Sequence, residues 1–153
     1  MQSSKRESHQ RLLLEHLGAE NRHRLDATLA TLTPDCVFED VALQRTFHGH
    51  AGAAEYYGLW WSAFDVRVER AGESYWISDD LYVSEPVYRG THVGEFLGVA
   101  PTHRPVHLRF VVFVSFKDGK FAGERFYYDL SSLLRQIGAK SLPEVENATG
   151  QDS

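Results

Sequence analysis

Asp129 is the residue of this sequence whose type and setting best suit acid–base chemistry. It follows the aromatic run Phe126-Tyr127-Tyr128 and precedes Leu130. Apolar surroundings raise the pKa of a carboxyl group toward the working pH, so that it can remove a proton next to a carbonyl group. The same residue also stands before Leu-Ser-Ser-Leu, where an aspartate is a natural helix N-cap. The sequence leaves both roles open, and one side chain can fill both.

His107 is the candidate partner of Asp129, and the register of one hairpin decides whether they meet. The turn signal is Lys117-Asp-Gly-Lys120. A two-residue loop pairs Lys117 with Lys120 and sets Leu108 opposite Asp129. A three-residue loop with the glycine as its bulge shifts the pairing by one residue and sets His107 opposite Asp129. In that register the imidazole and the carboxylate would orient and tune each other.

Arg125 and Tyr127 share a face with Asp129, because side chains alternate along a strand. On the cavity side, Arg125 would hold Asp129 ionised or bind an oxyanion. On the outer side it would be a surface or dimer contact. We expect Tyr127 to face the cavity, and the sequence leaves the side of Arg125 open.

Four more residues are candidates for substrate binding. His92 lies between two glycines and either lines the pocket or is a hydrogen-bonded strand histidine. Tyr56, Trp60 and Phe64 recur every four residues, which places them on one stripe of a helix. Such a stripe is usually core, but core and pocket wall coincide when helices cover a curved sheet. We expect these rings to shape specificity without reacting.

Neither a metal nor a cofactor is predicted. Glu20 and His23 are three residues apart on an expected helix, but a carboxylate-bridged metal site needs a second such pair. His48 and His50 flank a glycine and indicate a turn. The sequence has no phosphate-binding glycine loop and no nucleophile elbow.

The elements that must position these residues fall into a helical first half and a second half of strands. The expected helices are Arg11–Leu17 (stopped by Gly18), Glu20–Leu32 (stopped by Pro34), about His50–Phe64, and Leu130–Ile137. The expected strands are a weak hairpin over Cys36–Phe47, then Val66–Ile77, Leu81–Phe96, Val106–Phe116 and Phe121–Tyr128. Glycines 90 and 94 predict curvature in the second long strand.

This order predicts an α+β fold in which the N-terminal helices cover one face of a curved, mainly antiparallel sheet. The concave face and the helices would enclose a pocket. The length of 153 residues fits a single domain. We expect an ordered core over about 10–138, with polar tails at Met1–Ser8 and Leu142–Ser153.

Composition excludes several classes of function. The chain is 42% hydrophobic and 24% charged with a net charge of −5, and it has no basic stripe, which disfavours nucleic-acid binding. No apolar run has the length of a signal peptide or a membrane span. Cys36 is the single cysteine, so no internal disulfide forms, and we expect a reducing, cytoplasmic setting.

Three segments resemble those of one family. They are Gly90-Thr-His-Val-Gly-Glu-Phe-Leu-Gly-Val-Ala-Pro-Thr102, then Glu124-Arg-Phe-Tyr-Tyr-Asp129, and Leu133-Leu-Arg-Gln-Ile-Gly138. Their order and spacing are similar to SnoaL-like polyketide cyclases of the NTF2-like superfamily, over roughly 10–138. The resemblance implies an NTF2-like, cystatin-like cone with a mixed sheet and a small-molecule pocket.

The resemblance also implies a chemistry. In these cyclases an aspartate just before the last helix acts as general acid/base in an aldol ring closure, and by position it would be Asp129 here. They also use a histidine on the preceding strand; His107 lies at the start of that strand, and its centre, Val111–Phe116, has none. Our first hypothesis is cofactor-independent cyclase, isomerase or hydratase chemistry on a small apolar carbonyl compound. The alternatives are a non-catalytic ligand-binding protein and a dimeric interaction module, and we expect a homodimer in each case.

Overall fold

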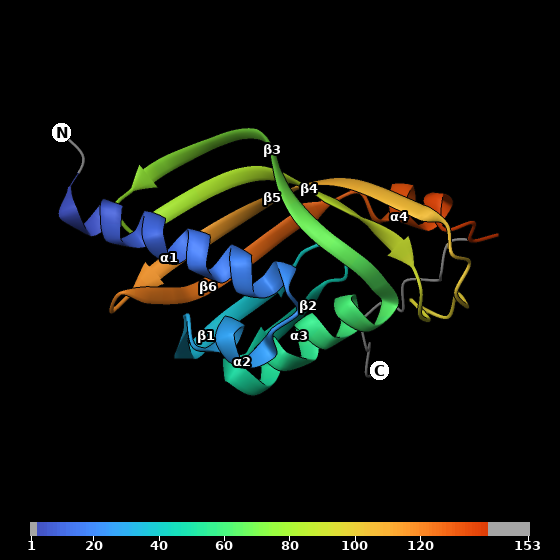
Figure 1. The fold of residues 1–153 in the computed structure, drawn as a ribbon, viewed down its shortest axis with the longest axis horizontal. Coiled ribbons are helices and arrows are strands. Elements are labelled where there is room, and N and C mark those ends of the chain that lie inside the picture. Colours follow the sequence, from blue (N-terminus) through green and yellow to red (C-terminus); the bar gives the residue numbers. More distant parts are fainter. Residues whose placement is uncertain (1–2, 141–153) are drawn as a thin grey trace, which may run out of the picture.

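The computed structural model describes residues 3–140, and six strands form one curved sheet in it (Figure 1). The strand order is β2-β1-β6-β5-β4-β3. All neighbours are antiparallel except β1 and β6, which are parallel. The strands are β1 (Leu32–Asp40), β2 (Arg45–His48), β3 (Phe64–Ser78), β4 (Leu81–His92), β5 (Pro105–Lys117) and β6 (Lys120–Tyr128). The predicted α+β class with a mixed, mainly antiparallel sheet is confirmed.

Four helices accompany the sheet: α1 (Ser4–Asn21), α2 (Leu25–Leu29), α3 (Gly49–Ala63) and α4 (Leu130–Gln136). The long helix α1 runs beside the curved strands, with α3 next to β1 and α4 at the far end of the sheet (Figure 1). No helix within residues 3–140 has the length and apolar character needed to cross a membrane.

The first helix differs from the prediction at both ends. It begins at Ser4, with the Ser3 side chain accepting a hydrogen bond from the Arg6 backbone N–H as an N-cap, so residues 4–8 are not a tail. It also continues through Gly18 to Asn21. The Asn21 side chain donates to the Val68 carbonyl and accepts from the Val68 N–H, both in β3. The predicted tail at Leu142–Ser153 lies outside the described residues.

The second expected helix, Glu20–Leu32, is replaced by a break, a short helix and a strand. His23 has a φ of 51°, a left-handed conformation that ends a helix. Its ring nitrogen bonds the Val66 carbonyl at 2.9 Å, so tertiary contacts select this break. Pro34 therefore lies inside β1 rather than ending a helix.

Strand β5 sets the two faces of the sheet. Its side chains alternate between buried and more exposed from Pro105 to Lys117. The buried set packs against the helices and forms the centre of the core: Val106, Leu108, Phe110, Val112, Val114 and Phe116. This concave face is where the enclosed space lies.

Polar contacts attach both ends of α1 to β3 and to the turn that follows it. Near its start, Lys5 and Arg6 form ion pairs of 2.7 and 2.9 Å with Asp80 and Asp79 in the turn after β3. At its end the side chains of Asn21 and His23 bond the backbone of β3. Between these points α1 turns His16 and Ala19 inward, where both are buried.

Candidate functional site

A cavity of about 70 Å³ lies between α1 and the concave face of the sheet. Its walls are mainly apolar, with side chains such as Leu13, Phe110 and Phe126. Among the polar side chains that line it, His16 and Glu20 from α1 and Glu124 from β6 approach one another from opposite sides. An apolar cavity with a few converging polar groups is the usual form of a small-molecule site.

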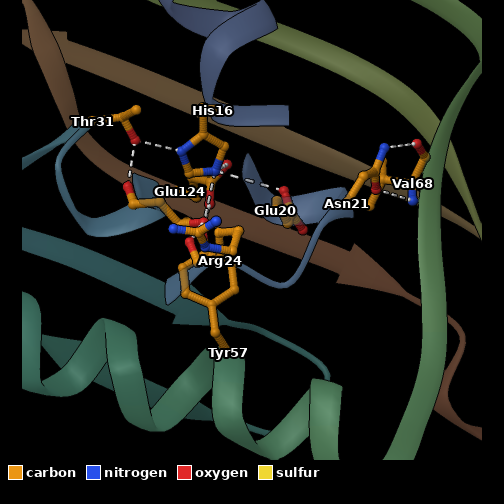
Figure 2. Close-up of polar contacts among 9 residues, drawn as sticks. His16, Glu20, Asn21, Arg24, Thr31, Tyr57, Val68 and Glu124 are labelled. Carbon is orange, nitrogen blue, oxygen red and sulfur yellow. Dashed lines mark hydrogen bonds and ion pairs between the residues drawn. The ribbon is translucent and has the colours of Figure 1, made fainter. Parts of the chain in front are cut away.

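The two carboxyl groups converge on one imidazole nitrogen (Figure 2). His16 Nε2 is 3.6 Å from Glu20 Oε2 and 3.9 Å from Glu124 Oε1. The Tyr57 hydroxyl, from α3, lies 3.0 Å from the same nitrogen and 3.3 Å from Glu124 Oε2. Four titratable side chains from three elements therefore form one buried cluster.

Burial holds both carboxyl groups toward their neutral forms. Desolvation raises the pKa of Glu20 to about 7, and a favourable contact with the Tyr88 phenol only partly offsets it. The pKa of Glu124 is raised well above its ordinary value, first by desolvation and then by the charge of Glu20. A carboxyl group that titrates near neutral pH is suited to proton transfer.

His16 is held neutral. Its ring stacks on Phe121 at 4.3 Å, its Nδ1 lies 2.7 Å from the Thr31 hydroxyl, and only 3% of the residue is exposed. Burial lowers the pKa of this imidazole to about 3. A neutral histidine beside two carboxyl groups that are held toward their neutral forms keeps the charge of the cluster low in the apolar wall.

The local folding of α1 and β6 explains how these groups meet. His16 and Glu20 are four residues apart, so they occupy the same face of α1 one turn apart. Along β6 the side chains of Glu124, Phe126 and Tyr128 point to the concave face, because they pair with the buried residues Val114, Val112 and Phe110 of β5. Figure 2 shows Tyr57 reaching the cluster from α3.

Comparison with known proteins places the fold and the site in a family. The profile of the SnoaL-like polyketide cyclase family matches residues 8–137. The chain belongs to this family. The residues that line the cavity of this SnoaL-like protein all lie within the matched segment.

Solved structures of similar proteins have the same fold. A candidate SnoaL-like polyketide cyclase from Jannaschia sp. CCS1 is 19% identical with a TM-score of 0.81, over 92% of this chain and 99% of that one. AclR, a candidate hydroxylase from Streptomyces galilaeus, is 26% identical with a TM-score of 0.72, over 84% and 94%. A protein of ketosteroid isomerase-like fold from Catenulispora acidiphila, solved with trimethylamine, is 20% identical with a TM-score of 0.70, over 83% and 92%. No curated protein matches the chain.

A second buried carboxyl group, Asp40, lies at the end of β1 and differs in its partners. Asp40 is fully buried, and its oxygens accept hydrogen bonds from the Leu43 N–H at 2.8 Å and from the hydroxyls of Tyr56 and Tyr128 at 2.8 and 2.9 Å. Burial raises its pKa, and the three donors act against that rise. A hollow of about 10 Å³ beside it is lined by Tyr56, Trp60 and Tyr128 among others.

The predicted catalytic pair does not meet in this SnoaL-like fold. Asp129 is exposed, lines neither cavity and accepts a 3.0 Å hydrogen bond from the Ser132 N–H as the N-cap of α4. Hydrogen bonds to this carboxylate, the Ser132 N–H first, lower its pKa. His107 is exposed, and its backbone bonds the Gln136 side chain.

Neither predicted hairpin register is the observed one along its whole length. The two-residue turn is confirmed, since Lys117 pairs with Lys120. A register shift follows between Phe116 and Ser115, where the extra residue on β6 is Ala122, so that Phe110 pairs with Tyr128. A slip of one residue exchanges the two faces of a strand.

That exchange puts Arg125 and Tyr127 on the outer face, contrary to our expectation for Tyr127. The guanidinium of Arg125 lies 4.6 Å from the ring of Phe113 and 5.8 Å from that of Tyr127. Tyr127 is 42% exposed. Both residues belong to the convex side of the sheet, away from the cavity.

The other predicted substrate-binding residues lie inside the molecule. His92 is fully buried, and its ring accepts a hydrogen bond of 3.1 Å from the Thr102 N–H. It lines neither cavity, so of the two roles considered for it the structure supports the hydrogen-bonded strand histidine. Tyr56 and Trp60 line the hollow beside Asp40, and Phe64 packs on Trp60 at 5.7 Å. Trp60 Nε1 is buried without a hydrogen-bond partner.

No three His, Cys, Asp or Glu side chains within residues 3–140 are grouped as a metal site. Of the helical pair weighed for a metal, Glu20 faces the cavity, whereas His23 bonds the Val66 carbonyl. The two belong to different environments because the helix ends between them.

Sequence reasoning missed the acid cluster itself. Glu124 shares its face of β6 with Phe126 and Tyr128, and a glutamate within an apolar face is the signal that marks it. His16 and Glu20 carried no such signal, because α1 is rich in charged residues on every side. Only the position of α1 over the sheet selects its buried face.

Proposed function

We propose that this protein is an enzyme that transfers protons without a cofactor, on a small, mainly apolar carbonyl compound bound in the cavity. The observation that carries the proposal is the buried pair of Glu20 and Glu124, both held toward neutrality beside an apolar wall. Two carboxyl groups with separated pKa values supply one acid and one base at the same pH.

The pair suits a reaction that begins with enolisation. One carboxylate takes the proton from the carbon next to the carbonyl group, and the electron pair of that C–H bond moves toward the carbonyl oxygen. The other carboxyl group donates a hydrogen bond to this oxygen as negative charge develops there. Return of the proton to another carbon gives an isomerase, and attack of the enol carbon on a second carbonyl gives a cyclase.

Membership of the SnoaL-like polyketide cyclase family supports this class of chemistry. Asp129, which the resemblance proposed as the acid–base residue, lies at the surface, so we assign the proton transfer to the cavity pair instead. The aromatic and aliphatic walls would exclude water and hold the apolar body of the substrate.

Hydrogen–deuterium exchange of enolisable compounds tests the proposal. Aryl β-diketones and β-keto esters would be incubated with the protein in D₂O, and loss of the α-proton signal followed by NMR. We expect catalysed exchange that falls at least about 100-fold in the double variant Glu20→Gln/Glu124→Gln. The matched control Asp129→Asn keeps its exchange.

Two outcomes would contradict this assignment. Exchange lost in Asp129→Asn but kept in the double variant would return the chemistry to Asp129. Binding of these compounds with no exchange in the native protein would favour the alternative of a non-catalytic binding protein with the same pocket.

We further propose that the protein forms a homodimer through the outer face of the sheet. Val37, Phe113, Arg125 and Tyr127 lie on that face, and Val37 and Tyr127 are 39% and 42% exposed. Sedimentation equilibrium would give twice the chain mass, and Tyr127→Glu would reduce it to the monomer. A native protein that sediments with the mass of one chain would contradict the proposed dimer.

We also propose a cytoplasmic location. Cys36 is free and fully buried, which fits a reducing cytoplasm. Fractionation of the source cells, followed with an antibody against this chain, tests the location. Recovery in the cytoplasmic fraction would support it, and recovery in another fraction would contradict it.

A further inference from the structure

A continuous row of hydrogen bonds leads from Glu124 to the backbone of α2. The Tyr57 hydroxyl lies 3.3 Å from Glu124 Oε2 and 3.0 Å from His16 Nε2. His16 Nδ1 lies 2.7 Å from the Thr31 hydroxyl, which is 2.6 Å from the carbonyl oxygen of Thr28. Figure 2 shows His16 between Thr31 and the side chains of Tyr57 and Glu124, with Glu20 to one side.

The direction of the row is set at its backbone end. The Thr28 carbonyl can only accept, so the Thr31 hydroxyl donates its one proton there. Thr31 then accepts from His16, which places the imidazole proton on Nδ1. Since His16 is neutral, its Nε2 carries no proton and acts as an acceptor.

The acceptor at Nε2 orients the rest of the row. Tyr57 has a single proton, and Nε2 is the nearer of its two neighbours, so the phenol donates to His16. The Tyr57 oxygen is then left to accept, and the group opposite it is Glu124. With the phenol proton on His16, the 3.3 Å contact between the Tyr57 oxygen and Glu124 Oε2 is a hydrogen bond only if Glu124 carries a proton and donates it to Tyr57.

We propose that the row formed by Tyr57, His16 and Thr31 holds a proton on Glu124 and leaves Glu20 as the carboxyl group that exchanges protons with the substrate. This division of roles rests on the proposed function of the pair. Tyr57, His16 and Thr31 are positioning residues in it. Glu20 is 3.6 Å from Nε2, and because that nitrogen carries no proton, His16 does not stabilise the ionised form of Glu20.

The other titratable groups around the pair leave this division unchanged near neutral pH. Tyr88 on β4 faces both carboxyl groups, and burial raises its pKa well above 10. Burial likewise raises the pKa of the Cys36 thiol on β1, next to Glu124. Arg70 on β3, a cationic side chain, lines the same cavity. Glu20 is therefore the member of this set that changes charge near pH 7.

The position of the proton on His16 is measured directly by NMR of the ¹⁵N-histidine-labelled native protein. Long-range ¹H–¹⁵N correlation distinguishes the two neutral tautomers and the cation. We expect the Nδ1–H form of His16 from pH 6 to pH 8. An Nε2–H form or a cation in this range would overturn the proposal, because Tyr57 would then accept from His16 and donate to Glu124, and nothing in the row would require a proton on Glu124.

Two conservative variants sharpen this test. Tyr57→Phe should shift the His16 Nε2 signal toward that of a nitrogen without a hydrogen bond. Its matched control, Tyr88→Phe, removes a phenol that faces the carboxyl pair but has no bond to His16 and should leave the signal in place. Equal shifts in the two variants would contradict the row.

The charge state of Glu124 is tested separately, through its effect on the titration of Glu20. Glu124→Gln keeps a donor at this position and carries no charge, like the protonated acid. Side-chain ¹³C NMR should therefore give the same titration midpoint for Glu20 in this variant as in the native protein. A midpoint lower by one pH unit or more would mean that Glu124 is ionised. These measurements need no substrate, so their failure is separate from a failure of the exchange assay.

Discussion

Two buried acidic sites lie on the concave side of this sheet, and they differ in the number of donors around them. Asp40 accepts three hydrogen bonds, from one backbone N–H and two phenols. Glu124 lies 3.3 Å from the Tyr57 phenol, and Glu20 contacts the Tyr88 phenol. The two carboxyl groups share the neutral imidazole of His16, at 3.6 and 3.9 Å. Desolvation acts on both sites, but only at Asp40 do three donors oppose it.

The difference separates a structural carboxyl group from a reactive one. A buried carboxylate with three donors is a fixed acceptor that ties β1 to α3 and β6. A buried pair with few donors costs stability when it ionises, and its protons are therefore available near neutral pH. The comparison predicts opposite signs for mutations at the two sites.

The largest expected effect is at Asp40. Asp40→Ala leaves the hydroxyls of Tyr56 and Tyr128 and the Leu43 N–H without an acceptor inside the core. We expect a loss of about 3 kcal/mol or more in the free energy of unfolding, measured by urea denaturation. The triple variant Asp40→Ala/Tyr56→Phe/Tyr128→Phe, which removes both hydroxyls as well, should recover part of it. A loss below about 1 kcal/mol would mean that Asp40 is not the structural site.

Glu20→Gln should act in the opposite direction, and with a defined pH dependence. Because the pKa is raised from 4.5 to about 7, the folded state holds its proton more tightly than the unfolded state. No penalty exists below pH 4.5, and the penalty grows as the pH rises to about 7. At pH 8 the variant should be more stable than the native protein by about 2–3 kcal/mol, and the gain should shrink at pH 5. A gain equal at both values would exclude titration of Glu20.

Asp129→Ala tests a carboxylate whose contacts are local. Loss of the N-cap of α4 should lower the thermal midpoint by roughly 2–4 °C, measured by circular dichroism. Asp129→Ser keeps a capping oxygen and should restore most of it. A midpoint that rises in Asp129→Ala would point to a strained group and reopen its catalytic role.

Glu124→Gln should change stability least when it is measured at pH 4, where the carboxyl group is largely protonated in the folded and the unfolded state alike. The amide has the shape of the protonated acid and keeps both a donor and an acceptor, so we expect the free energy of unfolding at pH 4 to stay within about 1 kcal/mol of the native value. At pH 7 the variant should be more stable than the native protein, because the native protein must then bind on folding the proton that Glu124 has lost in the unfolded state. No gain at pH 7 would mean that the folded protein does not hold a proton on Glu124.

The sequence predicted the fold where one physical signal dominated. The alternation of β5 and the aromatic stripe of α3 gave both elements nearly to the residue. The break after Asn21 was missed, because the bonds that cause it are made to Val66 and Val68, more than forty residues away. Helical periodicity within the segment contains no trace of those partners.

The candidate site was missed for a related reason. The turn at Asp118-Gly119 was predicted, but the bulge at Ala122 was not. Gly123 follows it because a side chain there would collide with the Val37 carbonyl of β1, a contact the sequence does not reveal. Because of this one extra residue on β6, Arg125 and Tyr127 face outward and Glu124 faces inward. The alternation of side chains along β6 was predicted, but Tyr127 was assigned to the wrong face of the sheet.

The two attachments of α1 respond differently to ionic strength. The Lys5–Asp80 and Arg6–Asp79 pairs are partly exposed, so added salt weakens them. The Asn21 and His23 bonds to the β3 backbone involve no ion pair and are largely indifferent to it. Salt therefore weakens the N-terminal attachment of α1 only in its first turn, because the buried ring of His9 stacks on Phe116 at 4.2 Å and bonds the Asp79 carbonyl at 2.7 Å. Amide exchange in the turn before His9 would quicken with salt, while the later turns of α1 keep their protection.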